Sequence, residues 1–420
     1  MAGGPRAEQM TQPSSPAARA DTVRVVGILM MVQSLGSMSS LWLPSIAPAV
    51  AADIGIDASM IGYQVLTMYI GAMTTSLMAG GMIARYGPWR TTQISAVLFG
   101  LGQLSIATAW IPTMALGSLV IGFGYGLVNP PASHLLAQVT TPKNRNFVFS
   151  IRYTGMPIGG VLAGLIAPSA ALAIGWRTSL FITIAFAFFC VIVMQPWRAR
   201  WDHDRNRDAR VWRNPLSDVV IAWRHPPLRW ICFLGFLFAG IQISLTSFTV
   251  TMLVEDVGYT LVAAGIALSC IQVAGVIGRV SWGAIADRFQ AGFMVLAVIG
   301  AISFVCAMLA VTLSDAWSTV LVYVLFFVFG FAAMGWNGVC MGEVARLSRP
   351  GLAGNMTGAV LFFTFSGVVG GPVAFAAAHA VTGRYTTTFI LTGGLALLGV
   401  GAILIGRAKA KQFGTETLPT

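Results

Sequence analysis

The stretch GRVSWGAIADRF, from Gly278 to Phe289, closes a long apolar run in the sequence. Asp287 and Arg288 near its end are typical of the end of a membrane helix, whereas Arg279 stands eight residues before Asp287, inside the apolar part. At 1.5 Å per residue this spacing places Arg279 about 12 Å from Asp287, close to the middle of a bilayer core. A guanidinium at that depth requires an anion, because an uncompensated charge there costs at least about 3 kcal/mol.

The whole chain has the composition of a membrane protein. Its 420 residues are 56% hydrophobic and 9% charged, with a mean hydropathy of +0.78, which lies outside the range of soluble domains. Apolar runs long enough to cross roughly 30 Å of hydrocarbon recur about twelve times, at 22–49, 59–84, 91–110, 112–139, 147–172, 176–195, 228–253, 260–286, 291–313, 316–345, 353–380 and 385–406. We therefore expect an all-α membrane protein with twelve transmembrane helices.

The distribution of charge predicts the orientation of the chain. If the N-terminus is cytoplasmic, every Lys and Arg except Arg177 and Arg384 falls on the cytoplasmic side or at a cytoplasmic helix end. This is the positive-inside pattern, and it places both termini in the cytoplasm. The net charge of +11 therefore reports the orientation of the chain and not a nucleic-acid partner. We expect a multi-pass protein in the lipid bilayer of a bacterial cytoplasmic (inner) membrane.

Nothing in the sequence predicts an enzyme or a cofactor. The five cysteines all fall within apolar runs and have no metal-ligand spacing, so we expect neither disulfides nor a metal site. No Gly-x-x-x-x-Gly-Lys-Ser/Thr loop occurs, so ATP bound by this chain is not the energy source.

The chain repeats itself on either side of one charged stretch, Arg198 to Asp218. Residue matches recur at a nearly constant offset of 208, too many to be accidental. The pairs are Asn129 and Asn337, Pro142 and Pro350, Gly159 and Gly367, Gly175 and Gly383, and Phe181 and Phe389. The expected parts are a disordered cytoplasmic tail (1–21), a first six-helix bundle (22–196), a cytoplasmic linker (197–227), a second six-helix bundle (228–406) and a cytoplasmic C-terminal tail (407–420).

A short loop also occurs twice, as GGMIARYGPWR after the second run and GAIADRFQAG after the eighth. Twelve spans, a six-plus-six repeat and a Gly-x-x-x-Asp-Arg loop resemble the major facilitator superfamily over nearly the whole chain. The second copy has Gly283, Asp287 and Arg288, whereas the first copy keeps Arg85 but has Ala84 in place of the aspartate. The resemblance therefore implies two pseudo-symmetric bundles and a gate whose two loops differ.

The gate residues expected on the cytoplasmic side are Asp287, Arg288, Glu343 and Arg85. Asp287 is suited to accept hydrogen bonds from the N-terminus of a neighbouring helix. Glu343 is the acid that we assign to Arg288; an i,i+3 pair between Glu343 and Arg346 is an equal alternative.

Four amides stand in the spans that the family resemblance assigns to a central cavity: Gln33, Asn129, Gln242 and Asn337. They form two pairs across the repeat, and a polar group in a bilayer core seldom faces lipid. We expect them to line the cavity; hydrogen bonding between helices is the alternative.

Pro130 and Pro131 after Asn129 should interrupt the fourth span. Phe362, Phe363 and Phe365 with Trp336 are expected either to form an apolar cavity wall or to face lipid.

Arg279 has no acid at its own depth in the sequence, so we expect a substrate carboxylate to bind it through two parallel hydrogen bonds. Gln272, seven residues earlier on the same helix face, would add a donor, and Gly275 between them would leave room. The sequence around Arg279 also resembles the eighth helix of bacterial monocarboxylate and oxalate/formate-type carriers, by which Arg279 would be the carboxylate ligand. The alternative is a gate ion pair with Glu343.

Two further ionisable residues stand in the spans. Arg152, about six residues into the fifth span, is expected to extend to the membrane surface; the alternative is a second basic group at the cytoplasmic mouth of the cavity. His134 has a pKa range that suits proton handling, as does Glu343 if protons are coupled, although a single membrane histidine is more often a packing residue.

The resulting prediction is a secondary active transporter that moves a small organic anion, a monocarboxylate, by alternating access with proton symport. It would act as a monomer, with the small-molecule anion and the proton as its partners and no cofactor. One alternative is a drug or metabolite efflux transporter of the same superfamily, and another is a membrane receptor that does not transport.

Overall fold

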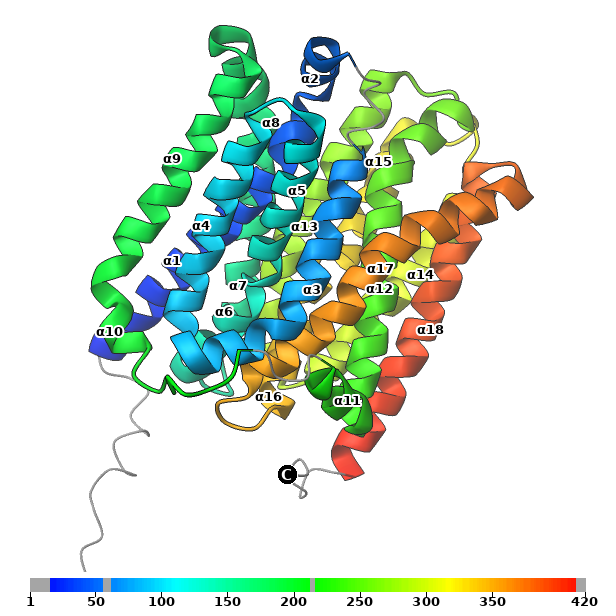
Figure 1. Ribbon diagram of the computed structural model, residues 1–420. Helices are drawn as coiled ribbons and strands as arrows, with labels where there is room; N and C mark the ends of the chain where they lie inside the picture. Colours follow the sequence, from blue (N-terminus) through cyan, green and yellow to red (C-terminus); the bar gives the residue numbers. More distant parts are fainter. Residues whose placement is uncertain (1–15, 56–61, 212–215, 413–420) are drawn as a thin grey trace, which may run out of the picture.

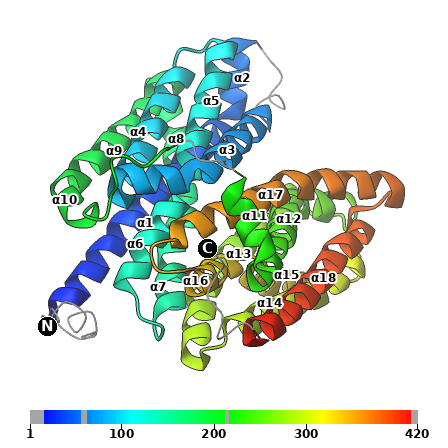
Figure 2. The same cartoon turned by 60° about the horizontal axis from the view of Figure 1, so that its bottom comes forward.

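The computed structural model describes residues 16–55, 62–211 and 216–412, and in these ranges all regular elements are helices. Figure 1 and Figure 2 show two helical bundles beside each other, one from each half of the chain. The first half contains α1 (Pro16–Ser45), α2 (Ala47–Ile54), α3 (Gly62–Tyr86), α4 (Pro88–Ile106), α5 (Ile111–Gly126), α6 (Asn129–Val139), α7 (Arg145–Tyr153), α8 (Gly155–Ile174) and α9 (Trp176–Met194). The linker contains a 3-10 turn (Gln195–Trp197), α10 (Arg198–Trp201) and α11 (Ser217–Arg224). The second half contains α12 (Pro226–Glu255), α13 (Leu261–Phe289), α14 (Gly292–Val311), α15 (Thr319–Ala333), α16 (Trp336–Leu347), α17 (Ala353–Thr382) and α18 (Tyr385–Gln412).

The twelve-helix architecture predicted from the sequence is confirmed. Eleven helices or continuous helix pairs among the described residues are long and apolar enough to cross a membrane, and α4 is the twelfth. Its polar side chains lower its hydropathy, but they are bonded to neighbouring helices. Gln103 Nε2 donates to the Ser39 carbonyl (2.8 Å), and Gln93 Nε2 donates to the Val191 carbonyl (3.2 Å). Bonding of this kind lowers the penalty of burying the amide N–H groups.

Three spans are interrupted in the middle. The fourth is divided between α5 and α6, where α6 begins with Asn129 and two prolines. Proline is tolerated there because the N–H groups of the first helical turn have no carbonyl acceptor within the helix, so a missing N–H breaks no hydrogen bond. The fifth is divided at Thr154 and the tenth at Met334 and Gly335. The predicted break at Asn129 is confirmed, while the tenth span breaks without a proline.

The two halves meet mainly at one end of the molecule. We call the end that contains α10, α11 and the C-terminal turn of α18 the linker side, and the opposite end the far side (Figure 1). The substantial contacts between the halves join α7 to α13 and α16, α6 to α16 and α17, and α3 to α17. The far-side half-helix α8 packs chiefly on α1 and α9 of its own half. The molecule is therefore closed on its linker side.

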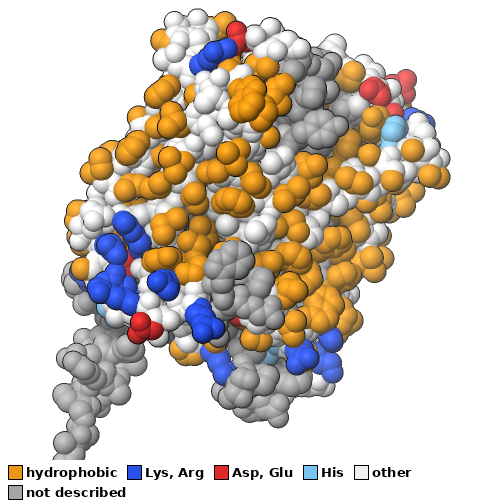
Figure 3. Space-filling view, in the orientation of Figure 1, with side chains coloured by type: hydrophobic (Ala, Val, Ile, Leu, Met, Phe, Trp, Pro, Cys, Tyr) orange, Lys and Arg blue, Asp and Glu red, His pale blue; other side chains and the backbone are white. Residues whose placement is uncertain are grey.

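The surface has a broad apolar belt. Figure 3 shows hydrophobic side chains over most of the visible face, with Lys and Arg gathered toward the linker side. Leu165 and Phe188 are 68% and 66% exposed on α8 and α9, as expected for residues that face lipid.

The helix ends differ from the expected domain boundaries by a few residues. α1 is already helical from Pro16, α12 begins at Pro226, and α18 continues to Gln412. Residues 1–15 and 413–420 of the two expected tails lie outside the described residues.

Candidate functional site

A small central cavity of about 70 Å³ lies between the two halves. Its walls include three of the four predicted amides: Asn129 from the first half, and Gln242 and Asn337 from the second. The other wall residues are Tyr69, Tyr125, Tyr153, Met156, Ala239, Ile243, Trp336, Leu361, Thr364, Phe365 and Val368. Gln33, Gln272 and Arg279 are not part of this wall.

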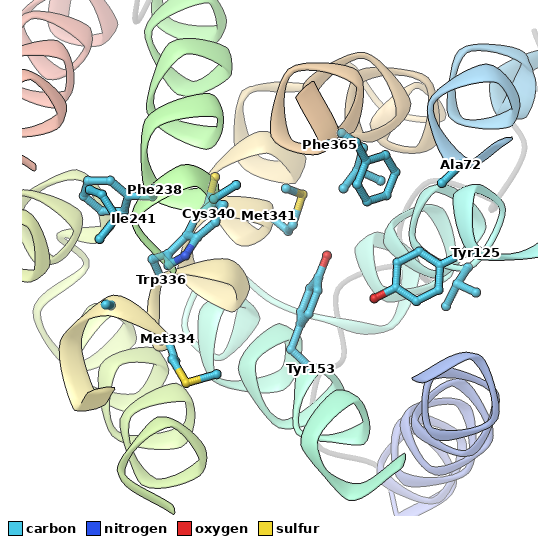
Figure 4. Packing of buried hydrophobic residues seen from close by; sticks show 14 of the residues in the cluster. Ala72, Tyr125, Tyr153, Phe238, Ile241, Met334, Trp336, Cys340, Met341 and Phe365 are labelled. Atoms are coloured by element: carbon cyan, nitrogen blue, oxygen red, sulfur yellow. The ribbon is translucent and has the colours of Figure 1, made fainter. Parts of the chain in front are cut away.

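Aromatic rings form much of the cavity wall. The Tyr69 ring meets the Tyr125 ring edge-on, with centroids 6.1 Å apart, and lies 5.7 Å from the Phe365 ring. Figure 4 shows the Tyr125 and Tyr153 hydroxyl groups directed toward the space between the halves, with Trp336 across from them. Mid-span tyrosines were the sequence signal for this wall, because a buried hydroxyl needs a polar neighbour.

The expected apolar wall is therefore formed in part. Trp336 and Phe365 line the cavity. Phe363 instead stacks on Trp223 of the linker helix α11, with ring centroids 5.3 Å apart, and Phe362 contacts Phe363.

The paired amides do not behave alike in the two halves. Gln242 Oε1 accepts hydrogen bonds from Trp336 Nε1 (3.0 Å) and Asn337 Nδ2 (3.1 Å), which fixes the second-half pair. In the first half Asn129 bonds to Arg152 instead, and Gln33 is fully buried with neither amide atom bonded to a described residue. The repeat is thus symmetric in residue type and asymmetric in bonding.

Arg152 is buried at the helix break, so the expectation that it extends to the membrane surface is wrong. It is 1% exposed. Its Nη1 donates to Asn129 Oδ1 and its Nη2 to the Val128 carbonyl (3.0 Å), while the guanidinium lies 4.9 Å from the Tyr153 ring centre. The break between α5 and α6 frees that carbonyl, and a freed carbonyl attracts a buried donor.

Arg279 is also 1% exposed, and its Nε and Nη1 have no hydrogen-bond partner among the described residues. Tyr125 lies near both Arg279 and Arg152. The two guanidiniums, one from each half, therefore flank a residue of the cavity wall. This arrangement concentrates positive charge beside the cavity, which suits an anion.

The surroundings predicted for Arg279 need one correction. A side chain on Gly275 would come within 2.8 Å of Met334 Cβ, so the space beside this glycine is filled by Met334 and is not free for a ligand. Gln272 is exposed on the same helix, two turns farther from the linker side.

Asp287 joins the two halves on the linker side, at the start of α7. Its Oδ1 accepts from Asn146 N (3.0 Å) and Asn146 Nδ2 (2.9 Å), and its Oδ2 accepts from Phe147 N (2.7 Å). A carboxylate at a helix N-terminus is stabilised by the unpaired N–H groups and by the helix dipole. Asp287 therefore lies where a gate residue is expected.

The other gate residues have different partners from those expected. Of the two partners considered for Glu343, the structure has Arg346, which donates to it at 2.6 Å, and Arg288 is exposed. Arg85 is exposed too, and its Nη1 donates to the Ala209 carbonyl of the linker (3.2 Å). Glu343 is hence not the partner of Arg279 in this structure.

His134 lies away from the cavity, on the linker side. Its Nε2 is 3.1 Å from Asp204 Oδ2 in the linker. The hydrogen bond from His134 holds the pKa of Asp204 below its usual value. This contact ties α6 to the linker.

The chain matches known proteins over most of its length. The family model described as Major Facilitator Superfamily matches residues 26–372. The 3-(3-hydroxy-phenyl)propionate transporter of Escherichia coli is 24% identical over 295 residues, which cover 66% of this chain and 68% of that protein. The 4-hydroxybenzoate transporter of Pseudomonas aeruginosa is 24% identical over 303 residues, covering 64% and 66%. The matched segments thus span about two thirds of these relatives.

Solved structures show the same fold at low sequence identity. The human organic anion transporter MFSD10 superimposes with a TM-score of 0.75 at 13% identity, covering 93% of this chain and all of that chain. The Escherichia coli fucose:proton symporter gives a TM-score of 0.70 at 15% identity, covering 93% and 99%.

Proposed function

Since this chain belongs to the Major Facilitator Superfamily, we propose that it is a secondary active transporter of a small organic anion, an aromatic monocarboxylate, which moves by alternating access with proton symport. The observation that carries the proposal is Arg279, a buried guanidinium with two nitrogens unbonded among the described residues. A buried cation is strongly destabilising when it lacks an anion. The substrate carboxylate supplies that anion and accepts the two parallel hydrogen bonds that arginine can donate.

The polar groups in the cavity wall and those buried outside it have different parts in binding the substrate. Arg152 is held by Asn129 and by the break in the fourth span, so it contributes fixed positive charge from the first half. Gln33 is buried and unbonded among the described residues, which makes it a second candidate ligand for the substrate. Asn337 and Gln242 bond to each other and keep the second-half wall in place.

The aromatic wall favours an aromatic substrate. Tyr69, Tyr125 and Phe365 offer ring faces and edges on which a planar ring packs favourably. The names of the two relatives above refer to hydroxylated aromatic acids. Both observations support the same substrate class.

Uptake against an inside-negative potential explains the proposed proton coupling. A monoanion entering the cytoplasm works against roughly 2.3 kcal/mol per 100 mV, which a co-transported proton offsets. The linker side is taken as cytoplasmic, since Lys and Arg gather there (Figure 3). His134 and Glu343 are the candidate proton carriers, together with the substrate acid itself.

The test is uptake of labelled benzoate and 4-hydroxybenzoate into proteoliposomes under an imposed pH gradient. We expect uptake by the unaltered protein and at least a tenfold loss of affinity in Arg279→Lys, since lysine keeps the charge but loses the two-pronged geometry. Arg384→Lys, at an exposed far-side arginine, is the matched control. Lactate tests the aromatic preference, and a cationic dye tests the efflux alternative.

Unchanged affinity in Arg279→Lys and Arg279→Gln would remove Arg279 from the substrate site. Transport of the cationic dye, unaffected by Arg279→Gln, would replace the anion proposal with an efflux function. Equal uptake with and without the pH gradient would reject proton coupling but would leave the proposed substrate class unaffected.

A further inference from the structure

The first copy of the gate loop lacks its carboxylate, and the space is visible in the structure. Ala84 stands where the second copy has Asp287, at an offset of 203 residues. A cavity of about 240 Å³ lies beside Ala84, with Gly80, His134, Asp204 and Asn355 among its lining residues. One side of the gate therefore has room for a side chain that the sequence does not supply at position 84.

On the intact side of the gate an asparagine is the partner of the aspartate. Asn146 near the start of α7 donates its backbone and side-chain N–H groups to Asp287 Oδ1. The helices lie so close that a side chain on Gly283 would come within 2.9 Å of the Asn146 carbonyl. The contact joins α13 of the second half to α7 of the first.

At the first copy of the gate loop the equivalent asparagine, Asn355, is present, and it donates to a carboxylate of the linker. Asn355, near the start of α17, is 209 residues after Asn146, the same offset that relates Gln33 and Gln242. Its Nδ2 donates to Asp218 Oδ2 at 2.9 Å. A side chain on Gly80 would overlap Asn355, so α3 approaches α17 here as closely as α13 approaches α7. Asp218 belongs to α11, the linker helix.

The part of the linker before α11 is hydrogen-bonded to the first half. Asn206 N donates to the Ala84 carbonyl (2.8 Å), and Arg85 Nη1 donates to the Ala209 carbonyl (3.2 Å). Asp204 bonds to His134 of α6. The linker thus runs along the loop that has lost its aspartate. Asp204 lines the cavity beside Ala84, and Asp218 accepts from Asn355, which lines the same cavity.

We propose that Asp218 of the linker replaces the missing gate aspartate at position 84, so that the linker is a working part of the linker-side gate. Asp218 acts as a positioning residue: it holds Asn355 and the start of α17 in the closed arrangement, as Asp287 holds Asn146. It reproduces the side-chain hydrogen bond to the asparagine, and Asp287 accepts backbone N–H bonds of α7 in addition.

The experiment measures the gate directly and needs no substrate. Spin labels at Tyr86→Cys on α3 and Phe289→Cys on α13, both exposed, report the distance between the halves in a background without the native cysteines. We expect mainly the short distance in the unaltered gate. Asp218→Asn should raise the ratio of long to short distances roughly five- to tenfold, because the amide oxygen still accepts from Asn355 Nδ2 but lacks the negative charge that strengthens this hydrogen bond. Asp208→Asn, at an exposed aspartate of the same linker, is the control.

The decisive arm is rescue. Ala84→Asp in the Asp218→Asn background puts the carboxylate back on α3, beside the cavity that borders Asn355, and should restore the short distance. A distance distribution that Asp218→Asn leaves unchanged overturns the proposal. So does failure of Ala84→Asp to restore the short distance in a double variant whose thermal unfolding matches that of Asp218→Asn. Both outcomes are independent of which solute the protein carries.

Discussion

Asp202 is a buried carboxylate in the linker whose protonation should affect stability. It is 4% exposed and accepts from Trp89 N (2.8 Å) and Arg90 N (3.1 Å) at the start of α4. Burial raises its pKa from 3.8 to about 6. Because the folded state binds this proton more tightly than the unfolded chain, the stabilisation is full below pH 3.8 and is lost as the pH rises through about 6.

We therefore predict that Asp202→Asn gains stability relative to the unaltered protein as the pH rises from 4 to 7. The amide imitates the protonated acid, so its contribution does not change with pH. Thermal unfolding followed by tryptophan fluorescence measures the difference, since Trp89 and Trp201 stack beside the site with ring centroids 6.2 Å apart. A difference in Tm that is constant between pH 4 and 7 would show that Asp202 does not titrate in this range.

At the level of single residues the sequence predicted which polar groups are buried better than it predicted their partners. The lack of an acidic partner for Arg279 could be predicted from its depth in the eighth span, since no acid in the sequence stood at the same depth. Arg152 did not, because a long side chain near a helix end usually reaches the surface, and only the three-dimensional break at Val128 supplies its acceptor. The hydrogen-bond partner of a buried group is often far away in the chain, and the hydrophobic periodicity of the sequence does not show which residues come together.

The close contact of α13 with α15 positions the helix that carries Arg279. A side chain on Gly278 would come within 2.2 Å of the Phe331 carbonyl, and that carbonyl accepts from Trp282 Nε1 (2.9 Å). Gly278→Ala must push the two helices apart and weaken that hydrogen bond. We expect a loss of roughly 1–3 kcal/mol in stability, as for other overpacked sites, and a change in Trp282 fluorescence.

The control for this substitution is Gly401→Ala in α18, where the added methyl group meets nothing within 4 Å. It should leave Tm unchanged or raise it, because alanine is the better helix former. If Gly278→Ala and Gly401→Ala have the same Tm, the contact between α13 and α15 is not as tight as described.

Helices were predictable as elements, and their interruptions only in part. Long apolar runs gave the spans, and the two prolines after Asn129 gave the break between α5 and α6. The break at Met334 and Gly335 has no proline, and it lies against another span: a side chain on Gly335 would come within 2.4 Å of the Trp282 ring. A contact of that kind between separate spans leaves no trace in local sequence.

At the scale of the molecule, closure of the linker side depends on Ser150 of α7. Side chains built on Gly283 of α13 and Gly338 of α16 would both come within 2.4 Å of Ser150 Oγ, so this small residue fills a narrow gap between the halves. Ser150→Leu should separate the halves on this side. We predict faster reaction of Cys340, which is fully buried on α16, with a maleimide in a protein that keeps only this cysteine.

Ser169→Leu, at an exposed serine of α8, is the matched control and should leave the Cys340 reaction unchanged. A Cys340 rate in Ser150→Leu equal to that of the control would mean that the two halves are held closed elsewhere.

The pair of buried guanidiniums also has an electrical consequence. Arginine stays protonated in proteins, so Arg152 and Arg279 carry two buried positive charges inside the membrane-spanning helices, one in each half. A monoanion neutralises one of them. Both the loaded and the empty protein then retain net charge within the transmembrane field, and any step that shifts these helices along the membrane normal moves that charge. Turnover would thus depend on membrane voltage in its own right, apart from any coupled ion.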